Sequence, residues 1–367
     1  MDGFVINFGM LPILLLAIAL LSRCRSSMPR AFLVGLTLAL LTITKSTYPD
    51  FSNYNNYYNG VHNGLITLSN SFEPPGWWAI CKFFSLFGLS YHGVVFILIL
   101  ISCFLLFVTY KILNIPDRIF WIIYLFVPGV INCVQVKYAC ALIVLFVSVL
   151  PYLKAVRGGT AIFIIGLLIS CSIHSSMAVY AILLLVNPLE KASGKSRIVS
   201  LAIMMAVAIS CLIFLPTFAK LLVPNSRYER YFGQSAEIPS LLWICRIGFG
   251  YILILSTAFF HHKYLLATSP DENTLKFNDR IMICLVLLST LLPLLLIEES
   301  MHRLFELSIL LCALKVNLKA GDKNFKFNRP FKLLCGLAFF LAFLNYTPLR
   351  TVVCVLLTFE GMQPLLL

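Results

Sequence analysis

Three residues of this sequence have side chains suited to removing a proton from a hydroxyl group. Asp50 and Glu73 stand before and after a stretch rich in Tyr and Asn, and His174 ends an apolar segment, in the sequence CSIHSSM. Carboxylates and imidazoles are common general bases in enzymes. Each also has a structural alternative, because the carboxylates can be solvated or cap a helix and the imidazole can bond a backbone carbonyl. The sequence does not rank the three as bases.

Basic side chains beside or inside apolar segments form a second group, suited to neutralising a phosphate. Arg246 lies inside the apolar segment LLWICRIGFG, where an unpaired charge is costly and usually faces a protein cavity. Lys137 and Arg303 can instead extend toward a membrane interface, and Arg227 and Arg230 can bind lipid head groups. The candidate diphosphate- and substrate-binding residues are Lys137, Arg227, Arg230, Arg246, Arg303, His302, Glu299, Tyr54 and Tyr58.

The spacing of the 12 cysteines gives no metal-binding or redox motif, because no CxxC occurs and most of them lie inside apolar runs. The sequence also has no Gly-rich phosphate loop of the kind that binds nucleotides. We therefore predict no metal site and no cofactor.

The elements that position these residues are membrane helices. The chain has 367 residues, of which 60% are hydrophobic and 12% charged, whereas soluble domains are about 45–50% apolar and about 25% charged. The apolar stretches are continuous rather than alternating, which favours helices over a barrel. The net charge of +13 reflects basic loops at one membrane face, and we do not expect nucleic-acid binding.

Hydropathy predicts an all-α, polytopic transmembrane bundle in one integral membrane domain, 1–367. About twelve spans are expected: 4–22, 31–47, 92–111, 119–135, 137–153, 159–174, 176–189, 198–218, 240–260, 281–297, 303–318 and 332–349. One set of loops, which includes Arg30, Lys111, Arg118, Lys154 and Arg157, holds 19 of the 28 Lys and Arg residues. Those loops are predicted to be cytoplasmic.

The two largest segments on the opposite side are 48–91 and 219–240, and we expect them to cap an active site there. Within the first, residues 77–90 (WWAICKFFSLFGLS) are amphipathic and too short to span, which predicts an outer interfacial or re-entrant helix. The candidate residues of the two groups fall on this outer side. Together they predict one polar cavity open to the outside.

The order of these elements resembles the EpsG family of polysaccharide polymerases, which is similar to the Wzy O-antigen polymerases. The resemblance rests on Asp50 before spaced tyrosines, on Glu73-Pro74-Pro75-Gly76-Trp77 followed by LFGLSY, and on His174-Ser175-Ser176. It is strong over residues 45–190 and looser beyond them. Two details depart from the family pattern: one proline is extra, and Lys137 stands where arginine is usual, which weakens a role that needs a bidentate guanidinium.

The resemblance implies a metal-independent glycosyltransferase in the bacterial inner membrane, with its active site facing the periplasm. Its substrates would be oligosaccharide repeat units linked to undecaprenyl diphosphate, joined into O-antigen or a related surface polysaccharide. Membrane lipid and a chain-length regulator protein are the other implied partners. In this reaction Asp50, Glu73 or His174 would act as the base, and the arginines with Lys137 would hold the leaving diphosphate.

Other functions fit parts of the pattern less well. An O-antigen ligase usually has a larger outer loop, and a lipid-oligosaccharide flippase should carry charges near the middle of the membrane. A structural scaffold would not need Arg246. A membrane acyltransferase would need an HxxxxD-type pair on the correct side, which the sequence lacks.

Overall fold

The computed structural model describes residues 26–43, 49–126, 135–192, 241–268, 271–292 and 305–318, and isolated positions within 16–24, 128–133, 194–210 and at 303. These residues form twelve helical elements and no strand, which agrees with the all-α prediction. They fall into two compact units, which meet in sequence between Ala181 and Ile182. Each unit is described by itself.

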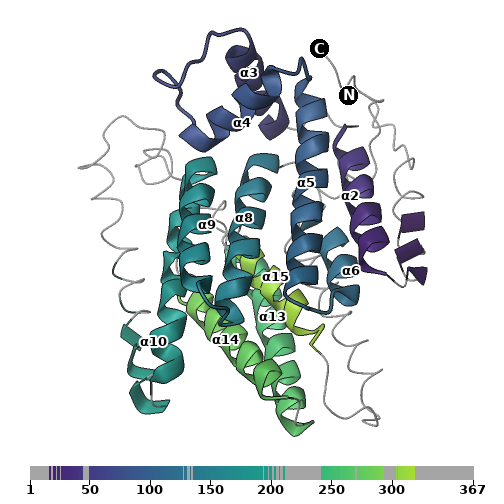
Figure 1. Cartoon of the computed structure of the whole chain (residues 1–367). Coiled ribbons are helices and arrows are strands. Elements are labelled where there is room, and N and C mark those ends of the chain that lie inside the picture. Colours follow the sequence, from purple (N-terminus) through teal and green to yellow (C-terminus); the bar gives the residue numbers. More distant parts are fainter. Residues whose placement is uncertain are drawn as a thin grey trace. The chain divides into compact units, whose positions relative to one another are not determined.

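The first unit is built around α5 (Tyr91–Ile112) and α8 (Val136–Leu153), the two described helices that are long and apolar enough to cross a membrane. The other helices of this unit are α2 (Ser27–Ile43), α3 (Pro49–His62), α4 (Pro75–Ser85), α6 (Arg118–Phe126) and α9 (Gly159–Ile173), followed by the 3-10 helix η1 (Ser175–Leu185). α2 packs on α5, and α8 packs on both α5 and α9. The short helices α3 and α4 lie across one end of this group (Figure 1).

Small residues allow the long helices to approach closely. A Cβ at Gly166 of α9 would lie 2.2 Å from the Ser148 side chain of α8, and one at Gly35 of α2 would lie 3.1 Å from Cys103 of α5. Close packing through small residues is typical of membrane helices. The outer surface of α9 is apolar: Ile165 is 58% and Leu168 is 65% exposed. A lipid environment explains such a surface better than water does.

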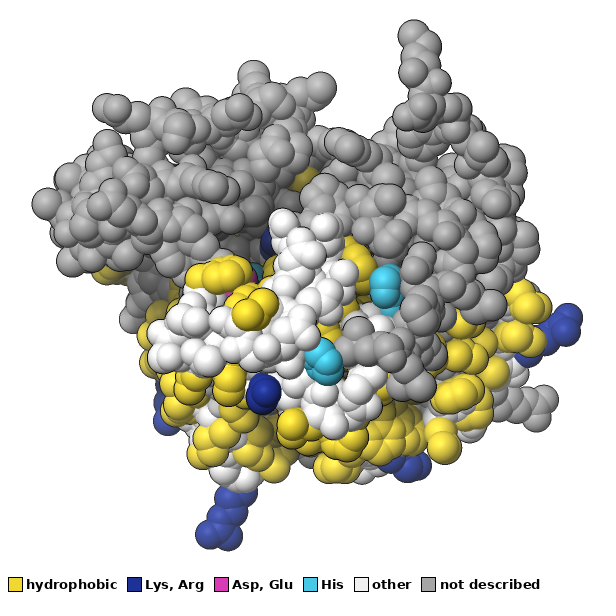
Figure 2. Space-filling model, turned by 90° about the horizontal axis from the view of Figure 1, so that it is seen from above, with side chains coloured by type: hydrophobic (Ala, Val, Ile, Leu, Met, Phe, Trp, Pro, Cys, Tyr) yellow, Lys and Arg dark blue, Asp and Glu magenta, His cyan; other side chains and the backbone are white. Residues whose placement is uncertain are grey.

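Local sequence signals explain how α4 and α5 begin. Pro74 is the residue before α4, and Pro75 is its first residue. Proline is suited to these positions because a backbone N–H there would have no partner within the helix. Ser90 caps α5 by accepting a hydrogen bond from the Gly93 amide. On the end that carries α3 and α4, isolated basic and histidine side chains lie among apolar patches (Figure 2). Phe83, Leu86 and Phe87 of the α4 region are more than half exposed, which suits a membrane interface.

The second unit contains α10 (Val186–Lys191), α13 (Leu241–Ala267), α14 (Glu272–Ser289) and α15 (Glu306–Lys315). α13, α14 and α15 pack on one another, and α10 packs on α14. Arg280 of α14 holds α10, because its guanidinium lies 2.5 Å from Glu190 Oε2 and 2.6 Å from Asn187 Oδ1. Lys315 is fully buried and donates to Asn278.

Most predicted spans that the structure describes exist as helices, with different bounds in several cases. The helices at 92–111, 137–153 and 159–174 agree to within one residue. The span expected at 119–135 is different, because α6 ends at Phe126, just before Pro128 and Gly129. The segment 176–189 is a 3-10 helix followed by a short α-helix rather than one span.

Two further differences concern loops and helix starts. α14 begins at Glu272, nine residues before the expected start of 281, because Asp271 caps it by accepting from the Thr274 amide. The tyrosine-rich stretch after Asp50, expected as a loop, is the helix α3. The spans predicted at 4–22, 198–218 and 332–349 lie wholly or mostly outside the described residues, so the total of about twelve stays a prediction.

Candidate active site

The start of α8 brings a basic residue to a predicted carboxylate. Lys137 is the second residue of α8, and its ammonium forms an ion pair with Oε2 of Glu73, in the segment between α3 and α4. The two side chains are 5% and 6% exposed. Removing either charge from such a site would leave the other buried and uncompensated. Each side chain can therefore be buried because the other neutralises its charge.

Aromatic rings cover the ion pair on the α3 and α4 side. The Lys137 ammonium lies 5.5 Å from the ring centroid of Tyr54, a cation–π contact. The Tyr54 ring in turn meets the Trp77 ring edge to face, with centroids 5.9 Å apart. The charged pair and the two aromatic rings thus form one cluster at this end of the unit.

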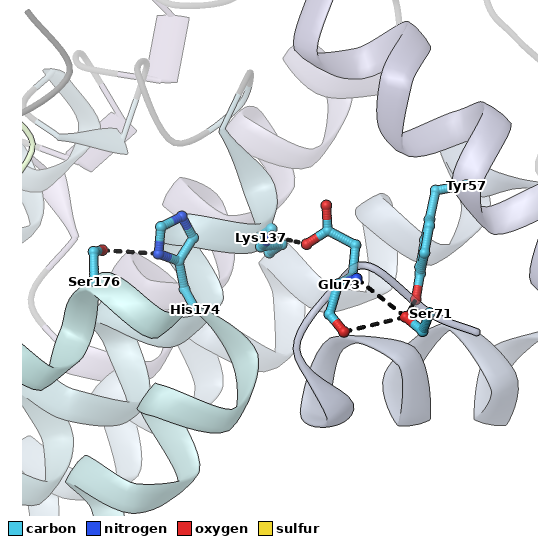
Figure 3. Close-up of polar contacts among 6 residues, drawn as sticks. All are labelled: Tyr57, Ser71, Glu73, Lys137, His174 and Ser176. Carbon is cyan, nitrogen blue, oxygen red and sulfur yellow. Dashed lines mark hydrogen bonds and ion pairs between the residues drawn. The ribbon is translucent and has the colours of Figure 1, made fainter. Parts of the chain in front are cut away.

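His174 comes to the same end of the unit from α9. It follows the last residue of α9 in an extended conformation, and its Nδ1 lies 2.8 Å from the Ser176 hydroxyl. Its ring packs edge-on against Tyr138, the neighbour of Lys137 on α8, with centroids 5.3 Å apart. In Figure 3 the side chains of His174 and Glu73 flank Lys137.

Gly76 allows the segment that carries Glu73 to approach α9. A Cβ at Gly76 would lie 2.3 Å from Ser172 Oγ and 2.8 Å from the Ser172 backbone carbonyl. No L-residue with a side chain fits there without a shift of one helix. Close contact between α4 and α9 therefore brings Glu73 and His174 to one end of the unit.

Not every predicted residue of this unit belongs to the site. Tyr58 is fully buried and donates its hydroxyl to the Leu89 carbonyl at 2.7 Å. Burial raises its pKa to about 12. Its contacts are those of a structural residue that joins α3 to the start of α5. Asp50 is the second residue of α3, and its side chain lies outside the described set.

A sequence model of the EpsG family matches residues 30–357. This chain belongs to the EpsG family. The match confirms the resemblance predicted from the sequence and extends it beyond residue 190. No curated protein and no solved structure matches the chain. EpsG membership and the apolar helices together make it a membrane protein connected with polysaccharide synthesis.

The EpsG elements that carried the resemblance are the ones that assemble the site. The Glu-Pro-Pro-Gly-Trp element supplies Glu73 and Trp77, the Lys137 segment opens α8, and the His-Ser-Ser element ends α9. The structure therefore brings together Tyr54, Glu73, Lys137 and His174 of the predicted set. Among the residues that the structure describes, no cluster of His, Cys, Asp and Glu has metal-binding geometry.

The arginines of the prediction lie in or near the second unit. Arg246 is part of α13, with its side chain outside the described set, and Arg303 is half-buried just before α15. Arg227, Arg230, Glu299 and His302 fall outside the described residues. The shared cavity that would unite these arginines with Glu73 stays a prediction.

Sequence reasoning missed several polar residues that support the site. Tyr57 and Ser71 contact each other beside Glu73, and Tyr138 donates to or accepts from the Tyr180 hydroxyl at 3.1 Å. In the second unit, sequence reasoning also missed Glu306, which is fully buried at the start of α15 and has no hydrogen-bond partner among the described residues at either carboxylate oxygen. Two sequence signals could have pointed to these residues. Ser71 carries a hydroxyl two positions before the candidate base Glu73, and Glu306 is an acidic residue about one helical turn after Arg303.

Proposed function

We propose that this protein is a polymerase that joins oligosaccharide repeat units linked to undecaprenyl diphosphate into O-antigen or a related surface polysaccharide. The reaction takes place at the periplasmic face of the bacterial inner membrane. EpsG membership supports the reaction class. The observation that carries the site assignment is the buried Glu73–Lys137 pair, with Tyr54, Trp77 and His174 around it.

The placement of the site supports the orientation. Glu73 and Lys137 lie near the start of α5, where Tyr58 bonds Leu89. The far end of α5 lies beside Lys111, Arg118 and Lys154, whose loops are predicted to be cytoplasmic. A site at the opposite end of a membrane-spanning helix faces the periplasm.

The chemistry follows from what each group can do. A hydroxyl of the acceptor attacks the anomeric carbon of the donor, and the bond to the diphosphate oxygen breaks with its electron pair leaving on the diphosphate. The hydroxyl proton passes to a base, for which Glu73, His174 and Asp50 are the candidates. The ion pair with Lys137 fixes the position of the Glu73 carboxylate. Tyr54, which is half-buried, provides a ring surface for the sugar, and the fully buried Trp77 packs against that ring.

The leaving diphosphate requires positive charge as the glycosidic bond breaks. Arg246, Arg303, Arg227 and Arg230 are proposed to supply it, with Lys137 in support. Undecaprenyl diphosphate departs, and the glycan grows by one repeat unit. Displacement by the acceptor inverts the configuration at the anomeric carbon.

A deletion strain tests the proposed reaction. Its surface glycan, separated on a gel, should show lipid A–core capped with single repeat units and no ladder of longer chains. The intact gene should restore the ladder. Absence of any repeat unit on the lipid A–core would contradict the proposal and favour a flippase. Long chains that stay on the carrier lipid would contradict it in favour of a ligase.

Point variants test the diphosphate assignment separately. Arg246→Ala and Arg303→Ala should abolish the ladder and leave the single-repeat product, at normal protein abundance. Arg157→Ala, an exposed arginine at the predicted cytoplasmic side, is the matched control and should keep the ladder. Normal ladders in both site variants would remove these two arginines from the mechanism.

A further inference from the structure

The hydroxyl of Ser71 makes three contacts that together fix the backbone around Glu73. Ser71 Oγ lies 2.7 Å from the Tyr57 hydroxyl, 3.1 Å from the Glu73 carbonyl oxygen and 3.1 Å from the Glu73 amide nitrogen. Tyr57 belongs to α3, and Ser71 and Glu73 belong to the segment that leads into α4. Figure 3 shows Tyr57 and Ser71 beside the Glu73–Lys137 pair.

The direction of every hydrogen bond at Ser71 follows from proton counting. A serine hydroxyl has one proton and two lone pairs, an amide N–H only donates, and a carbonyl only accepts. Ser71 must therefore donate to the Glu73 carbonyl and accept from the Glu73 amide. Its remaining lone pair accepts from Tyr57. Desolvation raises the pKa of Tyr57 to about 12, so Tyr57 retains the proton that it donates at neutral pH.

This arrangement joins a non-helical segment to a fixed helix. Residues 63–74 connect α3 to α4 and expose much of their surface, with Leu65 73% and Leu68 56% exposed. Tyr57 is 3% exposed and packs edge to face on Phe72, with ring centroids 5.3 Å apart. The amide and the carbonyl of Glu73 both bond the Ser71 hydroxyl, and that hydroxyl is held by Tyr57 of α3. The position of α3 therefore sets the position of the Glu73 backbone and of the side chain attached to it.

We propose that Ser71, anchored by Tyr57, is a positioning residue that sets the backbone of Glu73 so that its carboxylate meets Lys137 and the substrate. The inference rests on the proposed function of the Glu73 site. A serine that bonds the amide two residues later is also a common turn element. An ordinary turn of this kind needs no contact from a separate helix. The hydrogen bond from Tyr57 of α3 therefore distinguishes Ser71 from a simple turn residue.

The experiment uses the full-length protein in membranes, supplied with lipid-linked repeat unit, and measures kcat, KM and protein abundance. The variants are Ser71→Ala, Ser71→Thr and Tyr57→Phe. We expect Ser71→Ala and Tyr57→Phe to lower kcat by roughly 10- to 100-fold, because a displacement of about 1 Å at a reacting group has effects of that size. KM and abundance should stay near those of the wild type. Ser71→Thr keeps the hydroxyl and should restore kcat.

Ser69→Ala is the matched control, because Ser69 is an exposed serine of the same segment that contacts Thr67 and not Glu73. It should leave kcat unchanged. The double variant Tyr57→Phe/Ser71→Ala should be no slower than Ser71→Ala alone, since both act through one contact chain. If Ser71→Ala fails to accumulate, Tyr57→Phe, which removes a single oxygen, decides the question.

Two results would overturn the inference: a kcat of Ser71→Ala equal to that of Ser69→Ala, or a failure of Ser71→Thr to restore activity at normal abundance. Glu73→Gln separates this failure from failure of the proposed function. If Glu73→Gln is inactive while Ser71→Ala and Tyr57→Phe are normal, the positioning role alone is wrong. If Glu73→Gln polymerises normally, the assignment of the site is wrong.

Discussion

Two buried ion pairs lie near opposite ends of α5, and they are built differently. Asp117, just before α6, receives Arg30 at 2.5 Å, the Trp121 indole at 2.6 Å and the Ser27 hydroxyl. Its partners come from the starts of α2 and α6. Glu73 instead lies on a segment outside the helices and meets a lysine from α8. A 22-residue helix such as α5 separates the two ends by about 33 Å.

The choice of cation separates a structural pair from a functional one. Arginine stays protonated in proteins, whereas a buried lysine can lose its proton. Loss of the carboxylate at Asp117 therefore leaves a permanent buried charge on Arg30, whereas the Lys137 ammonium still meets the Tyr54 ring after loss of the carboxylate at Glu73. The surroundings differ in the same sense: Asp117 is held by groups that join helices, and Glu73 lies beside rings and a histidine. The pair at Asp117 should be needed for folding and the pair at Glu73 for chemistry.

Asp117→Asn should have the largest effect on stability. Breaking a buried ion pair from one side costs about 3–5 kcal/mol, and Arg30 is 6% exposed. We expect the variant to accumulate poorly and to unfold at lower temperature when purified in detergent. Arg118→Ala, at the exposed neighbouring position, is the control and should accumulate normally. Normal abundance and unfolding temperature for Asp117→Asn would remove the distinction between the two pairs.

Glu73→Gln makes the same chemical change at the other pair, and here activity should fall instead of stability. The amide is isosteric and can still accept from Lys137, but it cannot take a proton. A general base contributes about 100-fold or more to rate, so we expect at least about a 100-fold loss of polymer at near-normal protein abundance. Quantitative glycan gels and immunoblots from one culture measure both. If Glu73→Gln kept its polymer yield but accumulated poorly, the Glu73–Lys137 pair would be needed for folding rather than for chemistry, contrary to this prediction.

Gly76→Ala tests the contact that brings Glu73 to α9. The added methyl group would meet Ser172, including its backbone, at 2.3–2.8 Å. Overpacking of this kind costs about 1–3 kcal/mol, and moving α4 should also displace Glu73. We expect both a lower unfolding temperature and less polymer. Gly64→Ala is not a matched control because Gly64 has a positive φ. The control is therefore Ala79→Ser on the exposed side of α4, where a surface substitution should cost less than about 0.5 kcal/mol. Polymer at wild-type length in Gly76→Ala would show that this contact does not position the site.

Sequence alone predicted the long helices, and it singled out four residues that the structure brings together: Tyr54, Glu73, Lys137 and His174. Continuous apolar runs give α5, α8 and α9 almost without error, since hydropathy is the signal that lipid selects. Glu73, Lys137 and His174 were found because each is an ionisable residue in an apolar or aromatic setting. Hydropathy is uninformative for the stretch that forms α3, which is polar and rich in Asn.

Tertiary contacts account for what sequence could not supply. Nothing local connects Glu73 to Lys137, which are 64 positions apart, and they were assigned to separate roles as base and phosphate ligand. Asp117 was not singled out, because its partner Arg30 lies in another predicted cytoplasmic segment, 87 positions away. Tyr58 was predicted to bind substrate because it lies in the same Tyr- and Asn-rich stretch as Tyr54. Its hydroxyl instead bonds the Leu89 carbonyl, a contact that depends on how α3 meets α5.

A third carboxylate, exposed at the start of α14, gives the smallest predicted effect and a baseline for the two buried pairs. Asp271 accepts from the Thr274 amide at 2.9 Å and from its hydroxyl at 2.6 Å, and these bonds, the hydroxyl first, lower its pKa. Asp271→Ala should cost about 1 kcal/mol, seen as roughly fivefold faster hydrogen exchange in the first turn of α14. Because the folded pKa is depressed, the contribution is complete above the unfolded value of about 3.9 and is lost as pH falls through the folded value. Asp271→Asn still caps the helix and should keep normal exchange near neutral pH, but without the loss of protection in acid. An acid-induced loss that persists in Asp271→Asn would assign the pH dependence to another group.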